Sequence, residues 1–516
     1  MNIRIRWMAL LVIALFLQPA MGQSQEVLNL TLEECIAKAL KNNLNVAIEM
    51  MNPELAGISI AKAKEIFMPR FELSYGANRQ ETPSYWWIQG AGTSINRLSD
   101  YSVGVVETIP TGGNLTLSLQ SYKSDTNQAF QLINPRYGST LRLDFVQPLL
   151  KNFGTKVNRA QIVQAENNMA ISDIQLQNTL VDTIYLVQET YWNLVYAIEN
   201  TNVKRQSLQL GRDLLAKNKK EVEFGQLAPI EILIAESQVA SREADMIQAE
   251  ALITRTEEVL KTIINLAAEG DARLKRIVPK DMPDFKEATV TIDEALKRAT
   301  DRRPDIQALR KTIESKELTV GVAKNQMLPG LDLQLSYWSP GISGDRILYL
   351  DDNPFLGVII GKQPGGAGGS LRDAFKLLYQ NWNIGLTLSI PLSNFLTKAD
   401  YAYAKMDLDQ SLVKLKNQEQ QMILDVSDAV RMIETNAKRT EAYRVARELA
   451  QKSLDAEVQK LQVGLSTNYF VLDFQEKLAN ARSMELKAKV DYILSVARLD
   501  KAMGTSLEKR NIQIAK

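Results

Sequence analysis

The residue types that most enzymes use for catalysis are scarce in this chain of 516 residues. Histidine is absent, which excludes His-based triads, His general bases and His metal ligands. The single cysteine, Cys35, cannot form an intramolecular disulfide, and its place in an amphipathic segment predicts a packing role. No arrangement of nucleophile, base or metal ligands is visible, so we expect no catalytic residues, no metal and no cofactor.

Two carboxylates lie a short distance after turns that contain glycine. Glu231 follows Gly225, and Asp473 follows Gly464 by nine residues, which is two and a half helical turns. Both acids are therefore expected close to a turn between two helices. Periodicity does not determine which way they face, and an ordinary solvated helix charge is the alternative for each.

Residues 1–22 have the pattern of an export signal. Arg4 and Arg6 precede an apolar run over 8–17, and Ala20-Met21-Gly22 is a small-x-small cleavage site. The apolar run is too short to span a bilayer, so we expect the segment to be removed and the mature chain to be exported. The whole chain carries 61 Lys and Arg against 60 Asp and Glu, and this balance argues against a nucleic-acid partner.

The elements that must position the turns occur twice in the chain. Matching segments are 30–40 with 290–300, 68–73 with 328–333, Gln147-Pro148-Leu149 with Ile390-Pro391-Leu392, and Phe224-Gly225 with Val463-Gly464. Matches in the same order, with only the spacing between them changing, indicate a duplicated unit. We predict a first repeat over residues 23–270, a linker over 271–289 and a second repeat over 290–516.

Each repeat contains one very long stretch without helix breakers. Residues 156–221 lack proline and contain one glycine, Gly211, and residues 397–462 contain neither. About 66 helical residues would be roughly 100 Å long, which is a rod and not an ordinary globular helix. Each rod ends at a glycine turn and the chain returns, so we predict helical hairpins over about 156–266 and about 397–504 with exposed tips.

Alternating apolar and polar residues predict strands between the helical parts. The alternation covers 71–75 and 141–145 in the first repeat and 331–337 and 384–390 in the second. We therefore place strands within about 70–148 and about 331–390. A soluble sandwich would alternate in the same way. The export signal favours an outer-membrane barrel, and Trp338 and Trp382 at strand ends predict its aromatic belt.

Four strands cannot close a membrane barrel, because the smallest such barrels have eight and an open edge leaves backbone groups unpaired in hydrocarbon. Several copies must therefore share one barrel. A further hairpin over about 101–124, around Pro110-Thr111-Gly112-Gly113, has no counterpart in the second repeat. It could add barrel strands or project as a flap. Residues 339–381 contain Pro364 and several glycines and predict a long, flexible external loop.

These motifs resemble the outer membrane efflux protein (TolC) family over essentially the whole mature chain. The matching segments are Leu30-Thr31-Leu32-Glu33-Glu34, Gln147-Pro148-Leu149-Leu150, Val463-Gly464-Leu465-Ser466 and Leu499-Asp500-Lys501-Ala502-Met503-Gly504. The resemblance implies a mixed all-α plus β-barrel fold. A homotrimer would form a twelve-stranded outer-membrane barrel, four strands from each chain, continued by a long periplasmic α-helical barrel. It would be a passive exit duct for efflux or secretion, working with a periplasmic adaptor and an energised inner-membrane transporter.

The resemblance also implies roles for residues at and beyond the hairpin tips. The adaptor contacts would be Phe224, Gly225, Leu227, Val463, Gly464, Leu465 and Ser466. Leu227 and Leu465 would be the exposed apolar contacts among them. Glu231 and Asp473 match acids that narrow the periplasmic entrance. Another acidic position of the family falls on Phe470, for which we expect packing.

Two other classes of protein fit the sequence less well. An exported structural coiled coil or adhesin-like protein would use the strands as a minor soluble domain. A periplasmic enzyme would need the catalytic groups that are missing. The exported substrate and the class of inner-membrane transporter cannot be read from the sequence, because a duct contacts its cargo loosely.

Overall fold

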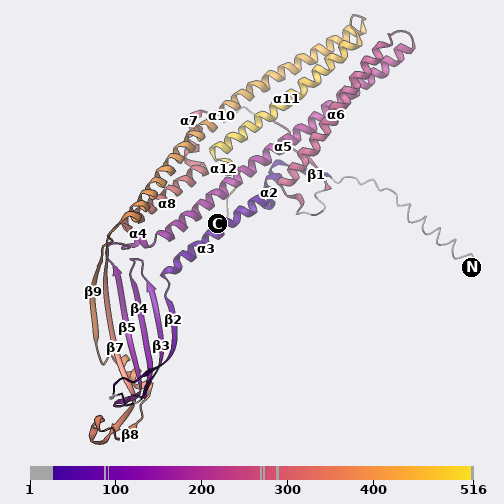
Figure 1. Ribbon diagram of the computed structural model, residues 1–516. Coiled ribbons are helices and arrows are strands. Elements are labelled where there is room, and N and C mark those ends of the chain that lie inside the picture. The colour runs from indigo at the N-terminus through magenta and orange to yellow at the C-terminus, as the bar shows by residue number, and fades with distance from the viewer. Residues whose placement is uncertain are drawn as a thin grey trace, which may run out of the picture. The chain divides into compact units, whose positions relative to one another are not determined.

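A computed structural model describes residues 27–86, 89–90, 92–267, 270, 274–285 and 290–512 of the chain (Figure 1). The predicted export signal, residues 1–22, lies outside this description. The chain forms two compact units, and each combines segments from both predicted repeats. The boundaries of the repeats and of the linker stay a prediction.

One unit, which we call the helical unit, comprises Met1–Asn52, Ser172–Ala308 and Lys416–Lys516. The other, the sheet unit, comprises Pro53–Ile171 and Leu309–Leu415. The boundaries between them lie within four helices, which are α3 (Leu44–Lys64), α5 (Ala160–Glu223), α8 (Pro304–Gln326) and α10 (Phe395–Gln462).

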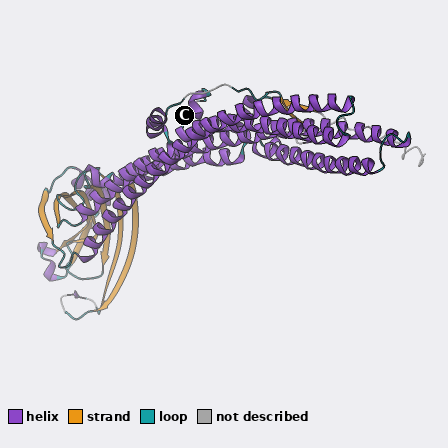
Figure 2. Ribbon diagram, turned by 90° about the horizontal axis from the view of Figure 1, so that it is seen from above, coloured by secondary structure: helices purple, strands orange, loops and turns teal. Residues whose placement is uncertain are grey.

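The two predicted rods are α5 and α10. They are single helices of 64 and 68 residues, which corresponds to about 100 Å along each axis. α6 (Ile230–Ile263) and α11 (Asn468–Met503) follow across short turns and run back alongside them (Figures 1 and 2). None of the described helices combines the length and the apolar composition needed to cross a membrane.

The core of the helical unit lies where a small β-ribbon meets the hairpins. β1 (Val27–Leu30) pairs in parallel with β6 (Arg276–Pro279), next to α2 (Leu32–Asn42). Tyr191 and Leu260 are fully buried there. Cys35 belongs to the same core, and burial raises the pKa of its thiol to about 12. The predicted packing role of this cysteine is confirmed.

The sheet unit contains one antiparallel sheet. Its main strands are β2 (Arg70–Pro83), β3 (Thr93–Thr108), β4 (Asn114–Thr126), β5 (Ile133–Pro148), β7 (Gly330–Tyr349) and β9 (Asn381–Ser389). They pair in the order β2-β3-β4-β5-β7-β9, and the short strand β8 (Ile359–Gln363) pairs with the far end of β7. β2 and β9 are therefore the outer strands of a run of six.

The further hairpin predicted near residues 101–124 is part of this sheet. It forms β3 and β4, which lie between β2 and β5. The four strands per chain that the resemblance implies are therefore too few for this sheet, which has six strands in one continuous run. The reason is the residue alternation: Val103 and Val105 pair with Leu119 and Leu117, so the hairpin continues the apolar face of its neighbours.

Residues 339–381 do not form the flexible loop that their glycines predict. β7 continues to Tyr349, and β8 and helix α9 (Ala367–Phe375) follow it. Small residues let α9 pack on β5 and β7: Ser139 Oγ and Ser370 Oγ are 2.9 Å apart. A side chain at Gly341 would collide with the backbone oxygen of Ser370. Gly341 therefore lies beneath a helix, and Gly368 and Gly369 belong to that helix.

Candidate functional site

The sheet has one apolar face. Directly opposed residues on neighbouring strands share a face. One such row consists of Phe71, Val105, Leu117, Leu143, Tyr337 and Trp382, and the rows beside it contain Leu73, Val103, Leu119, Leu141, Leu115, Phe145, Leu335 and Ile384. Phe71 and Leu73 on β2 and Leu386 on β9 are 69%, 73% and 65% exposed. An apolar band that crosses six strands and lies on the surface requires an apolar environment.

The alternate residues form a polar face. Arg142 Nε and Asp144 on β5 form an ion pair at 2.7 Å, and Ser336 Oγ on β7 donates to Asp144 at 2.5 Å. The guanidinium of Arg142 also lies over the Trp338 ring, 5.4 Å from its centre. The same face carries Glu72, Ser74, Asp100, Ser102, Ser118, Gln120, Gln334 and Asn383. A sheet with lipid on one side and water on the other has this alternation.

The two tryptophans of the predicted aromatic belt lie on different faces. Trp382 pairs with Tyr337 on the apolar face and is 71% exposed. Trp338 is the neighbour of Tyr337 in the strand, so it lies on the polar face opposite Arg142. The strand register is therefore consistent with Trp382 and Tyr337 as the residues of the aromatic belt. It places Trp338 on the polar face, which the sequence analysis did not predict.

Both hairpin tips have the same backbone structure. At the end of α5, the N–H of Gly225 donates to the carbonyl of Val222, and the N–H of Gln226 donates to that of Glu221. Gly464 repeats this arrangement at the end of α10. The two glycines have φ angles of +70° and +75°. This is a Schellman motif, which requires a left-handed residue and explains glycine at both tips.

Apolar side chains cover the outer surface of the tips. Phe224, Val463 and Leu465 are 76%, 70% and 79% exposed. Leu227 and Ser466 are half-buried, so Phe224, and not Leu227, is the exposed apolar residue beside Leu465. The surface that a partner can reach therefore carries exposed apolar side chains at both tips.

The buried carboxylate of Glu457 stabilises the second tip through a hydrogen bond with Ser466. Ser466 Oγ donates to Glu457 at 2.5 Å, and Lys460 Nζ lies 3.0 Å from the same side chain. The Ser466 hydrogen bond and the Lys460 charge hold the pKa of Glu457 below its usual value. Glu457 is therefore ionised at neutral pH and keeps the serine of the predicted adaptor site turned toward α10.

The two predicted entrance acids lie near the tips, as their spacing requires. Both are half-exposed. Glu231 is in the first turn of α6, and the carboxylate of Asp473 is 2.6 Å from Lys477 Nζ, one turn further along α11. Among the described residues, no hydrogen bond or ion pair joins the two acids. Phe470 is 48% exposed and packs edge-to-face on Tyr469.

A buried arginine near the tips escaped the sequence analysis. Arg242 on α6 is 5% exposed, and its burial lowers the pKa of the guanidinium. It donates to the backbone oxygens of Ser207 on α5, at 2.8 Å, and of Leu472 on α11, at 3.0 Å. Arg242 therefore connects the first hairpin to the second. The sequence feature that could have pointed to this contact is Gly211, a glycine inside the long helix α5. A Cβ at this position would lie 3.1 Å from Arg242 Nη1, so the glycine leaves space for the guanidinium.

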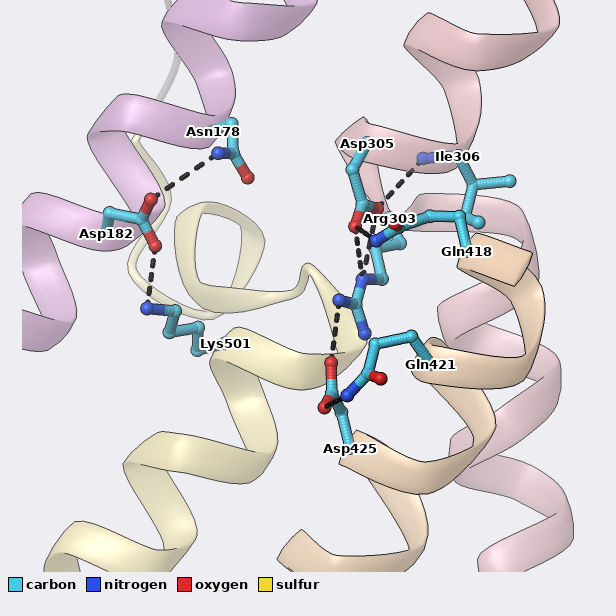
Figure 3. Close-up of polar contacts among 9 residues, drawn as sticks. All are labelled: Asn178, Asp182, Arg303, Asp305, Ile306, Gln418, Gln421, Asp425 and Lys501. Carbon is cyan, nitrogen blue, oxygen red and sulfur yellow. Dashed lines mark hydrogen bonds and ion pairs between the residues drawn. The ribbon is translucent and has the colours of Figure 1, made fainter. Parts of the chain in front are cut away.

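A second polar cluster in the helical unit has paired charges throughout (Figure 3). Arg303, directly before α8, lies 2.9 Å from Asp305 and 2.9 Å from Asp425 on α10. Asp182 on α5 lies 2.8 Å from Lys501 on α11. Because each charge drawn there has a partner within the chain, we assign the cluster to helix packing and not to a ligand.

Comparison with known proteins identifies this arrangement. Residues 295–505 match the model of the outer membrane efflux protein family. The chain is 26% identical over 356 residues to outer membrane protein TolC of Vibrio cholerae, covering 67% of this chain and 73% of that protein. It is 20% identical over 372 residues to alkaline protease secretion protein AprF of Pseudomonas aeruginosa, covering 70% and 68%. The CmeC outer membrane channel of Campylobacter jejuni shares the fold, with a TM-score of 0.66, 18% identity, and coverage of 93% of this chain and 88% of that chain.

The fold is that of a solved outer-membrane channel, and it combines a two-faced β-sheet with long helices in a mixed α and β structure. The resemblance to the outer membrane efflux protein (TolC) family that the motifs predict is confirmed. It is located in the outer membrane and extends into the periplasm. This is a family of channel and transport proteins and not a class of enzymes.

Replacing Arg242 with methionine, which keeps an unbranched apolar stem but removes the guanidinium, should loosen the connection between the hairpins. Loss of two charge-assisted hydrogen bonds in a buried site should destabilise the helical unit by about 2–3 kcal/mol. We expect a lower apparent melting temperature, followed by circular dichroism in detergent. The matched control is Arg212→Met, because the side chain of Arg212 is 52% exposed and its ion pair with Glu243 lies on the surface. Equal melting of both variants would contradict the assigned role.

Proposed function

We propose that this chain is the passive exit duct of an efflux or secretion system, assembled as a homotrimer in the outer membrane. The observation that carries the proposal is the sheet with one apolar and one polar face. The apolar face meets lipid and the polar face lines a water-filled lumen. The duct performs no catalytic step, and the energy comes from an inner-membrane transporter.

We propose the hairpin tips as the docking site for a periplasmic adaptor. The contacts are Phe224, Gly225, Leu227, Val463, Gly464, Leu465 and Ser466. Exposed Phe224, Val463 and Leu465 supply apolar area on a rigid Schellman turn, which is the combination that a protein interface uses. The adaptor joins the duct to the transporter, and the transporter selects the cargo.

We propose that Glu231 and Asp473 narrow the periplasmic entrance of the trimer. Three copies of each acid near a threefold axis would concentrate negative charge at the entrance and attract cations. The Lys477 partner of Asp473 partly offsets its charge. Glu231 has no such ion pair among the described residues. Its negative charge is therefore not offset, and it should attract cations more than Asp473 does.

An exported structural coiled coil is the alternative function, and fractionation separates the two. A duct must sediment with outer membranes, need detergent for extraction and migrate as three chains by cross-linking or mass photometry. It must also conduct ions in a planar bilayer. A stable monomer that leaves the membrane in salt or alkali would refute the duct.

Replacing Gly464 with valine should abolish transport while the trimer still assembles. The space around Gly464 is open, so the cost comes from its φ of +75°. A left-handed conformation costs an L-residue about 1–2 kcal/mol and is a severe outlier for a β-branched one. The measurements are export of the cargo and co-purification of the adaptor. Gly464→Asn is the matched control, because asparagine tolerates this conformation and should retain both. Normal export by the valine variant would exclude the tip from docking.

Neutralising the entrance acids should reduce cation selectivity and block by a trivalent cation. Glu231→Gln and Asp473→Asn each remove three charges from the trimer. Lys477→Met removes the partner of Asp473 and should increase cation selectivity and block by the trivalent cation. Because this is the opposite effect, the variant is the internal control. Single-channel recording in planar bilayers measures both properties. If all three variants conduct and block like the wild type, these residues are ordinary surface charges.

A further inference from the structure

The two outer strands of the sheet carry this inference. β2 pairs with β3 and β9 pairs with β7, and the described chain provides no strand for the other edge of either. Backbone N–H and C=O groups on such an edge would stay unpaired in hydrocarbon, so these edges cannot remain open in a membrane. Something must pair with both.

The two edges are complementary to each other. Because six strands alternate in direction, β9 of one copy runs antiparallel to β2 of the next. A register with Leu73 opposite Leu386 also aligns Phe71 with Leu388 and Tyr75 with Ile384. All of these residues lie on the apolar face. A slip by one residue would turn the apolar set of one strand toward water, so the register is restricted to even steps.

We propose that β9 of each copy pairs with β2 of the next, and that three copies close a barrel of eighteen strands, six from each chain. The inference rests on the proposed function and its trimer. The partner is a second copy of this chain, and the barrel is incomplete without it. Because barrel diameter grows roughly linearly with strand number, this barrel would be about 1.5 times as wide as the twelve-stranded barrel that the resemblance implies.

A twelve-stranded trimer would require β3 and β4 to leave the sheet, so that β2 pairs with β5. That change would break the ladders that run along β3 and β4. It would also remove Val105 and Leu117 from the middle of the apolar row. The structure pairs both residues in that row, between Phe71 and Leu143.

The added strands also enlarge the polar lining of the lumen. Asp100 and Ser102 on β3 and Ser118 and Gln120 on β4 lie on the polar face. Barrels of 16–18 strands leave an aqueous channel. The outer-membrane section of this duct would then admit bulky solutes, and the narrowest point would lie elsewhere along the path.

Cysteine pairs on opposed strands test the proposed interface in native membranes. Leu73→Cys with Leu386→Cys should cross-link neighbouring copies into dimers and trimers on denaturing gels. Within one chain these positions are five strand spacings apart, about 24 Å, which is too far for a disulfide. The natural cysteine, Cys35, is buried and does not interfere. Ser74→Cys with Leu386→Cys is the matched control, because Ser74 lies on the other face.

A second pair separates eighteen strands from twelve. In the six-stranded sheet, Leu73 pairs with Val103 and is three spacings, about 14 Å, from Leu141. The Leu73→Cys and Val103→Cys pair should therefore form a bond within one chain, and the Leu73→Cys and Leu141→Cys pair should not. The opposite result, or a trimer with twelve strands by electron microscopy, would overturn the inference and leave the proposed function intact. A chain that neither inserts nor conducts would refute the function itself.

Deleting residues 93–126 gives a matched narrow channel. The deletion removes β3 and β4 together and joins residue 92 to Asn127. These two positions are already close, because Asn127 Nδ2 donates to the backbone oxygen of Thr93, the residue after 92, at 2.8 Å. β2 can then pair with β5 with Phe71 opposite Leu143, on the same face. We expect a trimer with twelve strands. A wild-type trimer with that same strand number would overturn the proposal, and the cysteine pairs decide the question if the variant does not fold.

Discussion

A sheet edge cannot stay unpaired in hydrocarbon, and most features of the sheet unit depend on that constraint. The chain meets it in two ways. Four of its strands, β3, β4, β5 and β7, are paired on both sides within the chain. The remaining edges, on β2 and β9, have matching direction and matching apolar faces. In the proposed barrel another copy of the chain pairs with these edges, so oligomerisation and membrane insertion become one requirement.

The requirement that backbone groups be hydrogen-bonded also explains the hairpin tips, where the long helices α5 and α10 end. A helix of 64 residues ends with carbonyls that have no intrahelical partner. At both tips a glycine with positive φ turns the chain so that its own N–H groups reach those carbonyls. Because the backbone is satisfied internally, apolar side chains such as Phe224 and Leu465 are left free on the surface. A stable turn and an available binding surface therefore have one structural origin.

Sequence reasoning succeeded where a local rule controls the structure. The absence of proline defines the rods, and glycine marks both tips. It failed where contacts between distant segments decide. Gly341 looks like a loop residue until α9 is placed on the strands. Arg242 looks like a surface charge until Gly211 makes room for it between two hairpins. Trp338 could be assigned to its face only once the register of β5 and β7 was known. The hairpin of β3 and β4 alternates clearly, but it has no counterpart in the second repeat, so the sequence left open whether it adds strands or projects as a flap.

That hairpin also shows how such a sheet can grow. One additional strand between β2 and β5 would reverse the direction of the edge presented to the next copy, and antiparallel closure would fail. Two strands preserve the direction, and the register from Phe71 through Val105 and Leu117 to Leu143 preserves the face. Closure around a symmetry axis therefore restricts changes in strand number to pairs in every chain. A hairpin is the smallest insertion that meets this restriction. The predicted first repeat contains such an insertion, and the predicted second repeat lacks it at the corresponding place. An inserted hairpin would therefore widen the proposed barrel without a change in the helical hairpins.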